Sequence, residues 1–150
     1  MRIVIQRVSE ASVTINKAIH ASIGKGFLIL VGIEDADSAD DAEWLAGKVA
    51  GLRVFDDENG VMNRSVVDVS GEVLVISQFT LHALTKKGNR PSYIRAAGHD
   101  KAIPLYELFC KKVSEKTGVD VKKGIFAADM KVALVNDGPV TILIDSRSKE

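Results

Sequence analysis

Cysteine, histidine and aromatic residues are scarce in this chain of 150 residues, and their scarcity limits what the protein can be. The only cysteine is Cys110, so no disulfide can form within one chain. The three histidines, His20, His82 and His99, lie far apart and lack the close spacing of a zinc or iron site. We therefore expect no metal ion and no other cofactor.

Long apolar runs and an excess of charge of one sign are also missing. The longest apolar run, residues 27–33, is far shorter than the roughly 18–20 residues that a membrane-spanning helix needs. The N-terminal residues 1–7 lack the apolar core of a signal peptide, so we expect a cytoplasmic protein without membrane contact. Twenty basic and twenty acidic residues leave no net charge, so any contact with nucleic acid requires a local basic patch.

The composition that remains is that of an ordinary globular protein, with 46% hydrophobic and 27% charged residues, and it excludes intrinsic disorder. A chain of this length buries about 68–70% of its unfolded surface, which is enough for one core. We predict a single domain over residues 1–150.

Several segments have the apolar patterns of strands. Alternation along residues 3–15 predicts a strand with one face in water, and the nearly continuous apolar runs at 27–31 and 72–79 are typical of strands buried on both faces. Three more strands are predicted near the C-terminus, joined by short turns that favour antiparallel pairing, at residues 121–126, 130–135 and 140–144.

Two segments have the spacing of helices. Residues 42–49 place apolar side chains on one face and follow Asp37 and Ser38, either of which can cap a helix. Residues 100–116 form an amphipathic pattern that stops at Gly118. Because strands and helices do not alternate strictly, the order favours an α+β domain, with a curved, mainly antiparallel sheet and two packed helices.

Common catalytic motifs are absent. The sequence has no P-loop and no Gly-x-Ser-x-Gly elbow, and the Gly24-x-Gly26 pair precedes a strand rather than opening a helix. Cys110 lies within the apolar pattern of the second predicted helix, which favours a packing role over that of a nucleophile.

Two polar segments follow or interrupt predicted strands. Ser77, Gln78, Phe79 and Thr80 come directly after a buried strand, and extended geometry would place Gln78, Thr80 and His82 on one face. The segment 136–141, Asn-Asp-Gly-Pro-Val-Thr, is either a hairpin turn or a rigid stretch that presents backbone carbonyls to a ligand. A trans bond before Pro139 is the general expectation, because cis bonds are only about 5–6% of X-Pro bonds in folded proteins.

Together these two segments closely resemble the Ser-Gln-Phe-Thr-Leu and Asn-x-Gly-Pro-x-Thr motifs of the D-aminoacyl-tRNA deacylase family. Further segments are similar to the family's pattern in the same order, so the resemblance covers essentially the whole chain: residues 6–13, 30–33, 52–55, 62–63, 65–66, 87–88, 90–92 and 128–130.

The resemblance implies a barrel-like sheet and a homodimer with active sites at the subunit interface. It also implies hydrolysis of the ester between a D-amino acid and the 3′-terminal adenosine of tRNA. Catalysis is implied for the segment Ser77, Gln78, Phe79 and Thr80. Substrate binding and chiral selection by main-chain atoms, through a cis bond reaching in from the other subunit, are implied for Gly138, Pro139, Asn136, Thr141, Met130 and Phe126.

A selector made of rigid backbone carbonyls works by exclusion. An L side chain would collide with it, and a 10⁴-fold rejection corresponds to roughly 5.5 kcal/mol. Glycine has no side chain to exclude, so we expect mischarged glycyl-tRNA to be hydrolysed as well.

The sequence leaves the hydrolytic step open. Backbone N–H groups near Phe79 and Thr80 are natural donors to the oxyanion. Thr80 is a possible nucleophile, with His82 as the only base near it in sequence. The alternative, which we favour, is that the neighbouring ribose hydroxyl orients a water molecule while Thr80 helps to position the ester.

A basic loop follows the first motif. Lys86, Lys87, Arg90 and Arg95 form either a tRNA phosphate contact or a solvated loop without a partner. A second class of function is also open, namely a module that binds RNA ends in the same pocket without catalysis.

Overall fold

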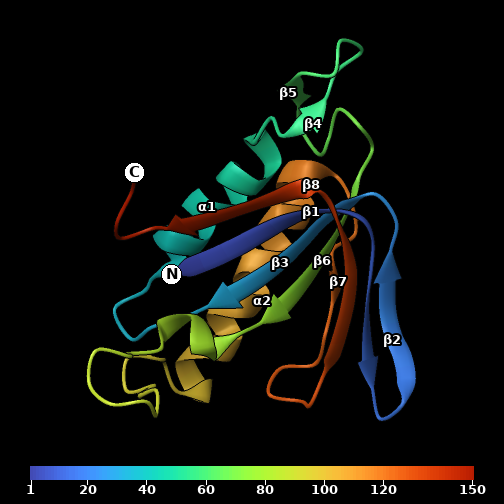
Figure 1. The fold of residues 1–150 in the computed structure, drawn as a ribbon. Helices are drawn as coiled ribbons and strands as arrows, with labels where there is room; N and C mark the ends of the chain where they lie inside the picture. The colour runs from blue at the N-terminus through green and yellow to red at the C-terminus, as the bar shows by residue number, and fades with distance from the viewer.

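The computed structural model describes residues 1–150, and its frame is a long pair of antiparallel strands. Strand β1 (Arg2–Ile15) pairs with β8 (Lys131–Asp145) along most of its length. On its other side, β1 pairs first with β3 (Gly26–Gly32) and then with β2 (Ala18–Ile23). Strand β1 therefore lies beside β3 in one half of the sheet and beside β2 in the other, and β8 follows it through both halves, as Figure 1 shows.

The sheet continues from β3 to β6 (Glu72–Ser77) and to the short strand β7 (Lys122–Lys123), and both of these pairings are parallel. The ammonium group of Lys122 on β7 donates a hydrogen bond of 2.8 Å to the carbonyl of Ser22 on β2. This contact brings the two ends of the strand order together, and the curved sheet forms a nearly closed barrel.

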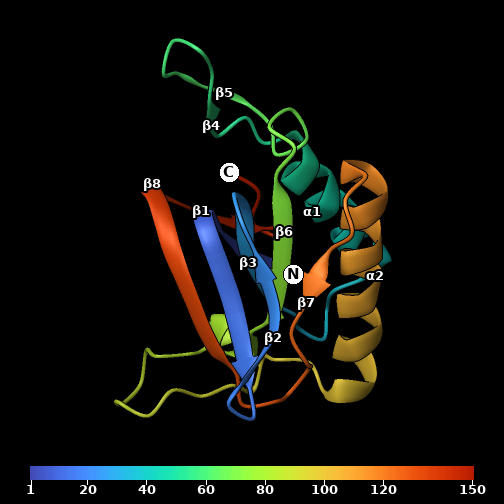
Figure 2. The same cartoon turned by 90° about the vertical axis from the view of Figure 1, so that its right-hand side faces the viewer.

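Two helices cover one face of the sheet (Figure 2). Helix α1 (Ala39–Gly51) follows Ser38, whose N–H donates to the Asp41 carboxylate at 2.8 Å. Helix α2 (His99–Thr117) ends at Gly118, which has φ of 75°. The same figure shows the hairpin of β4 (Phe55–Asp56) and β5 (Met62–Arg64) projecting beyond the sheet.

The central strands are buried on both faces, as their continuous apolar runs predict. Phe27 and Ile29 on β3 belong to the core beneath the helices, whereas Leu28 belongs to a second core within the barrel. Alternate residues of one strand therefore stabilise two different layers. The α+β class and the two packed helices are confirmed, although the sheet is mixed because of its two parallel pairings.

The prediction of three C-terminal strands joined by turns is wrong. Only Lys122–Lys123 forms a strand in the first of these segments, and residues 131–145 form one uninterrupted strand without a hairpin. The polar segment fits inside β8 because the register with β1 shifts there, and because Asn136 Oδ1 accepts the Val140 N–H at 3.0 Å. The Asn136 side chain thus accepts a hydrogen bond that a backbone carbonyl of a neighbouring strand accepts in a regular sheet.

No helix of the structure is long and apolar enough to cross a membrane.

Candidate active site

A cavity of about 640 Å³ opens where strand β6 ends. One wall is the end of β6 with the residues after it, Ser77, Gln78 and Phe79. The other walls are the start of α2 with the loop before it, and the segment 126–132 that leads into β8. Most lining residues are apolar, which suits the face of a ring better than a charged ligand.

The first motif turns sharply at this cavity. Gln78 N donates a hydrogen bond of 2.7 Å to the carbonyl of Val31, and the chain then enters the 3₁₀ turn η1 (Phe79–His82). The turn packs directly on Gly32, where a Cβ would lie 2.9 Å from Leu81 Cβ. The expectation that Gln78, Thr80 and His82 share one face of a strand is therefore wrong, because β3 ends at Gly32 and offers no further strand partner.

Several aromatic rings line the cavity. Phe79 is 55% exposed and meets Tyr93 edge to face, with ring centroids 5.0 Å apart. Phe126 packs against His99 at 5.4 Å in the same manner. Of the predicted site residues, Ser77, Gln78, Phe79, Phe126 and Met130 all line this cavity.

Thr80 and His82 do not form a nucleophile and base pair. Gln78 Nε2 donates a hydrogen bond of 2.6 Å to the Thr80 hydroxyl. The His82 ring is buried, and neither of its nitrogens has a hydrogen-bond partner. Its Nδ1 lies 3.8 Å from a Glu34 carboxylate oxygen, which is too far for a hydrogen bond.

The second motif lies on the exposed surface of β8 and does not line the cavity. The bond between Gly138 and Pro139 is cis, as the family resemblance implies and contrary to the general expectation for X-Pro bonds. Arg7 holds the segment by donating from Nε to the carbonyl of Asp137 at 2.8 Å. Asn136 Nδ2 donates to the hydroxyl of Thr141 at 3.0 Å. One chain therefore does not bring the two motifs together.

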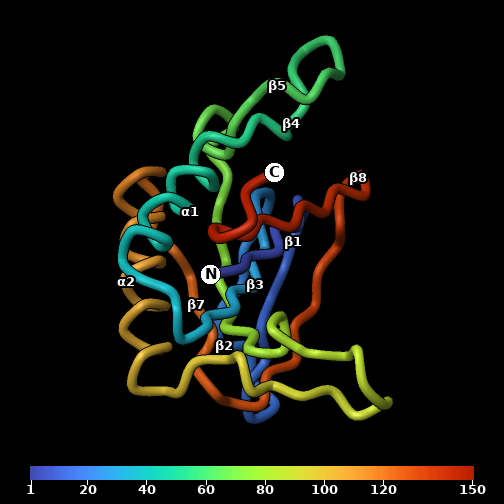
Figure 3. The backbone as a smooth tube through the Cα atoms, turned by 90° about the vertical axis from the view of Figure 1, so that its left-hand side faces the viewer, coloured from blue at the N-terminus to red at the C-terminus, as the bar shows by residue number.

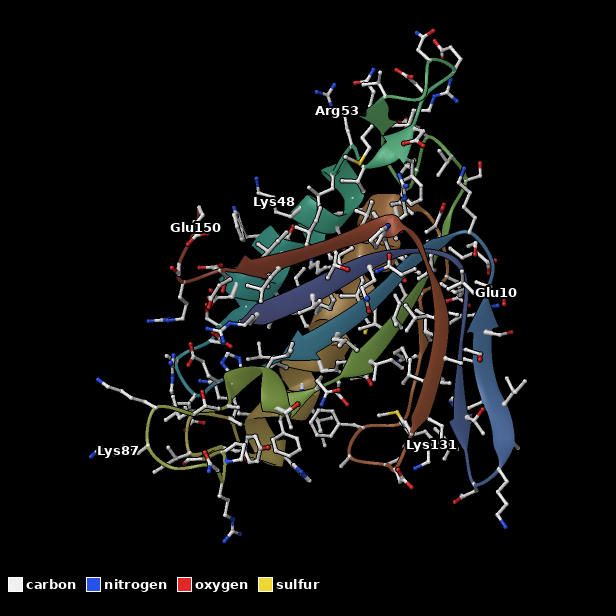
Figure 4. All side chains as sticks on the ribbon, in the orientation of Figure 1. Glu10, Lys48, Arg53, Lys87, Lys131 and Glu150 are labelled. Carbon is white, nitrogen blue, oxygen red and sulfur yellow. The ribbon has the colours of Figure 1, made fainter.

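The basic loop splits into free and paired cations. Lys86, Lys87 and Arg90 are exposed and form no ion pair, and Figure 4 shows Lys87 pointing away from the body of the molecule. Arg95 instead donates to Oε2 of Glu34 at 2.7 and 3.1 Å. In the tube view of Figure 3, this loop projects from the end of the sheet opposite the β4–β5 hairpin.

Cys110 is a packing residue in the core and not a nucleophile of the cavity. Burial raises the pKa of the Cys110 thiol to about 12, so this side chain is a neutral thiol in the core. No group of three or more His, Cys, Asp or Glu side chains is placed to hold a metal ion.

Some cavity residues were not predicted. Tyr93 and His99 line the cavity, yet they lie in a loop and at a helix start without a periodic signal. Their only indication in the sequence is the long loop after the first motif, of the kind that often carries function: Tyr93 lies in this loop and His99 directly follows it.

Comparison with known proteins gives one consistent family. The family model described as D-Tyr-tRNA(Tyr) deacylase matches residues 4–145. Relatives called D-aminoacyl-tRNA deacylase are 65% identical in Phocaeicola vulgatus, 63% in Porphyromonas gingivalis and 61% in Flavobacterium psychrophilum, each over 100% of both chains.

Solved structures share the fold. One described as a c-Myc DNA unwinding element binding protein is 38% identical, with a TM-score of 0.90 over 97% of this chain and 98% of its own. A second, described as a probable eukaryotic D-amino acid tRNA deacylase, is 17% identical with a TM-score of 0.82 over 95% and 97%. The fold and the cavity define a barrel-like α+β protein with a pocket at the end of its central strands. The chain belongs to the D-aminoacyl-tRNA deacylase family.

Proposed function

We propose that this protein hydrolyses the ester bond of D-aminoacyl-tRNA and releases the free D-amino acid and tRNA. The observation that carries the proposal is the convergence of Ser77, Gln78 and Phe79 with Phe126 and Met130 around one cavity. Its volume of about 640 Å³ lies in the range of small-molecule sites. The terminal adenosine occupies this cavity, with its base against the apolar wall.

The reaction breaks the bond between the acyl carbon and the ribose oxygen. Water attacks the carbonyl carbon, a tetrahedral oxyanion forms, and the ribose oxygen leaves with a proton. The backbone N–H groups of Phe79 and Thr80 lie at the start of η1, where the first amides of a helical turn have no partner within it, and they donate to the oxyanion. The neighbouring ribose hydroxyl orients the water, because no side-chain base pairs with Thr80.

The active unit is a homodimer in which each subunit completes the other's site. The Gly138–Pro139 segment faces solvent and does not line the cavity of its own chain, so a second copy is needed to bring it there. Strand β8 pairs with β1 alone, so its other edge is unpaired, and its exposed side chains include the apolar Val135 and Leu143. A free edge of this length is suited to contact with another chain.

Chirality is sensed by the main chain of that segment. A carbonyl held near the substrate's Cα accepts a hydrogen bond from its ammonium group, whereas an L side chain would collide with it. This arrangement accepts many D side chains, and it also admits glycyl-tRNA because glycine presents no side chain to exclude. Asn136, Thr141 and Arg7 hold the segment in place through the hydrogen bonds described above.

The protein acts in the cytoplasm and contacts tRNA through the loop after η1. Lys86, Lys87 and Arg90 are exposed and carry no ion-pair partner, so they are free to bind phosphates. Arg95 contributes less, because Glu34 already occupies its guanidinium.

A complementation experiment tests the shared site. Ala128→Trp fills the cavity, and Gly138→Ala places a Cβ 2.8 Å from Val140 Cγ2 on the second motif. Each homodimer should lose hydrolysis of D-Tyr-tRNA while keeping its fold by circular dichroism. When the two variants are co-expressed, half of the dimers are mixed and one of their two sites is free of both substitutions. About a quarter of wild-type activity should therefore return. Inactive mixed dimers would contradict the shared site, and an inactive wild-type protein that still binds tRNA would favour the non-catalytic RNA-end module.

A further inference from the structure

The turn that carries Phe79 and Thr80 is held from behind by an arginine at the start of the chain. Arg2 Nη1 donates a hydrogen bond of 2.7 Å to the carbonyl of Leu81 in η1. The same guanidinium donates from Nε and Nη2 to one carboxylate oxygen of Asp145, at 3.1 and 2.9 Å. Arg2 therefore joins the end of β8 to the turn.

The strand register places these groups together. In the sheet, Arg2 lies opposite Asp145 on β8 and opposite Gly32 on β3, the residue on which η1 packs. The start of β1, the end of β3 and the turn lie at one end of the sheet in Figure 1. Residues far apart in sequence thus meet behind the cavity wall.

Asp145 fixes the direction in which the guanidinium points. Burial opposes ionisation of this carboxyl, but the N–H of Arg147 and the side chain of Arg2 both donate to it and lower its pKa. Only 11% of the Asp145 side chain and 27% of the Arg2 side chain are exposed. A partly buried pair of this kind is screened less by water than a surface pair.

The turn has few other anchors. Its N-terminal side is tied to β3 by the hydrogen bond from Gln78 N to the Val31 carbonyl. Within it, Ala83 N donates to the Thr80 carbonyl at 3.1 Å, and Leu81 N reaches the Gln78 carbonyl at 3.3 Å. Beyond the turn, Leu84 and Ser92 exchange two backbone hydrogen bonds of 2.8 and 3.0 Å. Arg2 nevertheless supplies the one side-chain hydrogen bond to a carbonyl of η1 itself.

We propose that Arg2 is a positioning residue for deacylation, which holds the N–H groups of η1 in their productive direction through the Leu81 carbonyl, with Asp145 orienting its guanidinium. This inference rests on the proposed function of η1. Arg2 does not line the cavity, so it acts through the turn and not on the substrate. A small displacement of such donors is enough to slow a reaction, because transition-state stabilisation depends on their geometry.

The test compares Arg2→Met with Arg147→Met. Arg147 is a matched control, because its side chain donates from Nη1 to the Ala36 carbonyl at 3.0 Å and pairs with Glu34 at 4.0 Å, without a hydrogen bond or ion pair to η1. For Arg2→Met we expect kcat on D-Tyr-tRNA to fall about 10²-fold with little change in KM, because the cavity that binds adenosine is intact. Amide hydrogen exchange of a peptide covering residues 78–83 should become about tenfold faster or more, since a charged hydrogen bond is lost. Arg147→Met should change neither readout.

Two further variants separate this role from general damage. Asp145→Asn should accelerate exchange in the same peptide. Its effect should not add to that of Arg2→Met, because both variants break the same link from Asp145 through Arg2 to the Leu81 carbonyl. Arg2→Lys keeps a donor and a positive charge and should restore part of kcat. If Arg2→Met leaves exchange in residues 78–83 unchanged, or if kcat is unchanged while exchange rises, the proposal is wrong. A wild-type protein without deacylase activity would overturn the proposed function, while the exchange measurement would still report whether Arg2 anchors the turn.

Discussion

The side-chain amide of Gln78 donates a hydrogen bond of 2.6 Å to the hydroxyl of Thr80. The hydroxyl oxygen is therefore an acceptor here, and no carboxylate, imidazole or amine is hydrogen-bonded to it to remove its proton. A threonine nucleophile needs such a base. The contact favours a role for Thr80 in fixing the turn that follows Gln78.

Replacing Thr80 separates these roles. Thr80→Val keeps the shape of the side chain and removes the hydroxyl. If Thr80 positions the turn, kcat should fall by less than about 10²-fold, whereas loss of a nucleophile costs about 10⁴–10⁶-fold. Single-turnover hydrolysis of D-Tyr-tRNA measures the difference. A loss of the larger size, or a covalent acyl-enzyme trapped on Thr80 in the wild-type protein, would restore the nucleophile hypothesis.

His82 provides an independent check on general-base catalysis. Its ring is buried without a hydrogen bond, and such an unpaired polar group costs about 1–3 kcal/mol. His82→Leu, of similar volume, should therefore leave the free energy of unfolding unchanged or raise it. Its pH profile of kcat should match that of the wild-type protein. A base role predicts instead a large loss of kcat and the disappearance of one ionisation from the profile.

The basic loop should account for part of the salt dependence of tRNA binding. Replacing both Lys86 and Lys87 by Gln removes two free cations, so the slope of log K against log salt should become shallower by about 1.4–1.8. Binding of uncharged tRNA between low and moderate salt measures this slope. The paired replacement of Lys111 and Lys116 on α2 removes the same charge elsewhere and should leave the slope unchanged. Equal slopes for the loop variant and the wild-type protein would place the tRNA contact elsewhere.

Cys110 should make the protein sensitive to alkali. Burial raises the pKa of its thiol to about 12, while in the unfolded chain it ionises near its ordinary value of about 8.5. Between these pH values the native state holds a proton that the unfolded state has lost. The thiol therefore has no effect below about pH 8.5, and stability falls as pH rises through this window, by up to about 1.4 kcal/mol per pH unit.

Denaturant unfolding between pH 8.5 and 10 checks this, with Cys110→Ala as the comparison. The substitution should flatten the dependence on pH even though it lowers stability by loss of packing. Identical pH slopes, or rapid alkylation of Cys110 in the native protein at pH 8, would show that the thiol is not buried as described.

Much of the fold follows from local patterns. Period-two alternation predicts β1, continuous apolar runs predict β3 and β6, and helical spacing after a cap at Asp37 or Ser38 predicts α1. These patterns did not predict the parallel pairing of β3 with β6. The crossover through α1 between them is the signal that could have indicated it, since parallel strands need a long connection.

The sequence predictions that the structure contradicts concern segments whose conformation depends on contacts with residues distant in sequence. The segment 136–139 has the composition of a turn, but Arg7 on β1 holds the Asp137 carbonyl and the strand continues. The end of β6 has no local stop, and the strand stops because its partner ends at Gly32. The motif residues that line the cavity could be predicted from the sequence. The cavity contact of Tyr93 and the hydrogen bonds of Arg2 and Arg7 could not, because they depend on contacts with residues distant in sequence.

The most direct test of the account is the ratio of kcat/KM for D-Tyr-tRNA to that for L-Tyr-tRNA with wild-type protein, after subtraction of spontaneous hydrolysis. A main-chain selector that excludes L side chains predicts a ratio of about 10⁴ or more. Comparable rates on the two esters, or no release of D-tyrosine above the spontaneous rate, would contradict it.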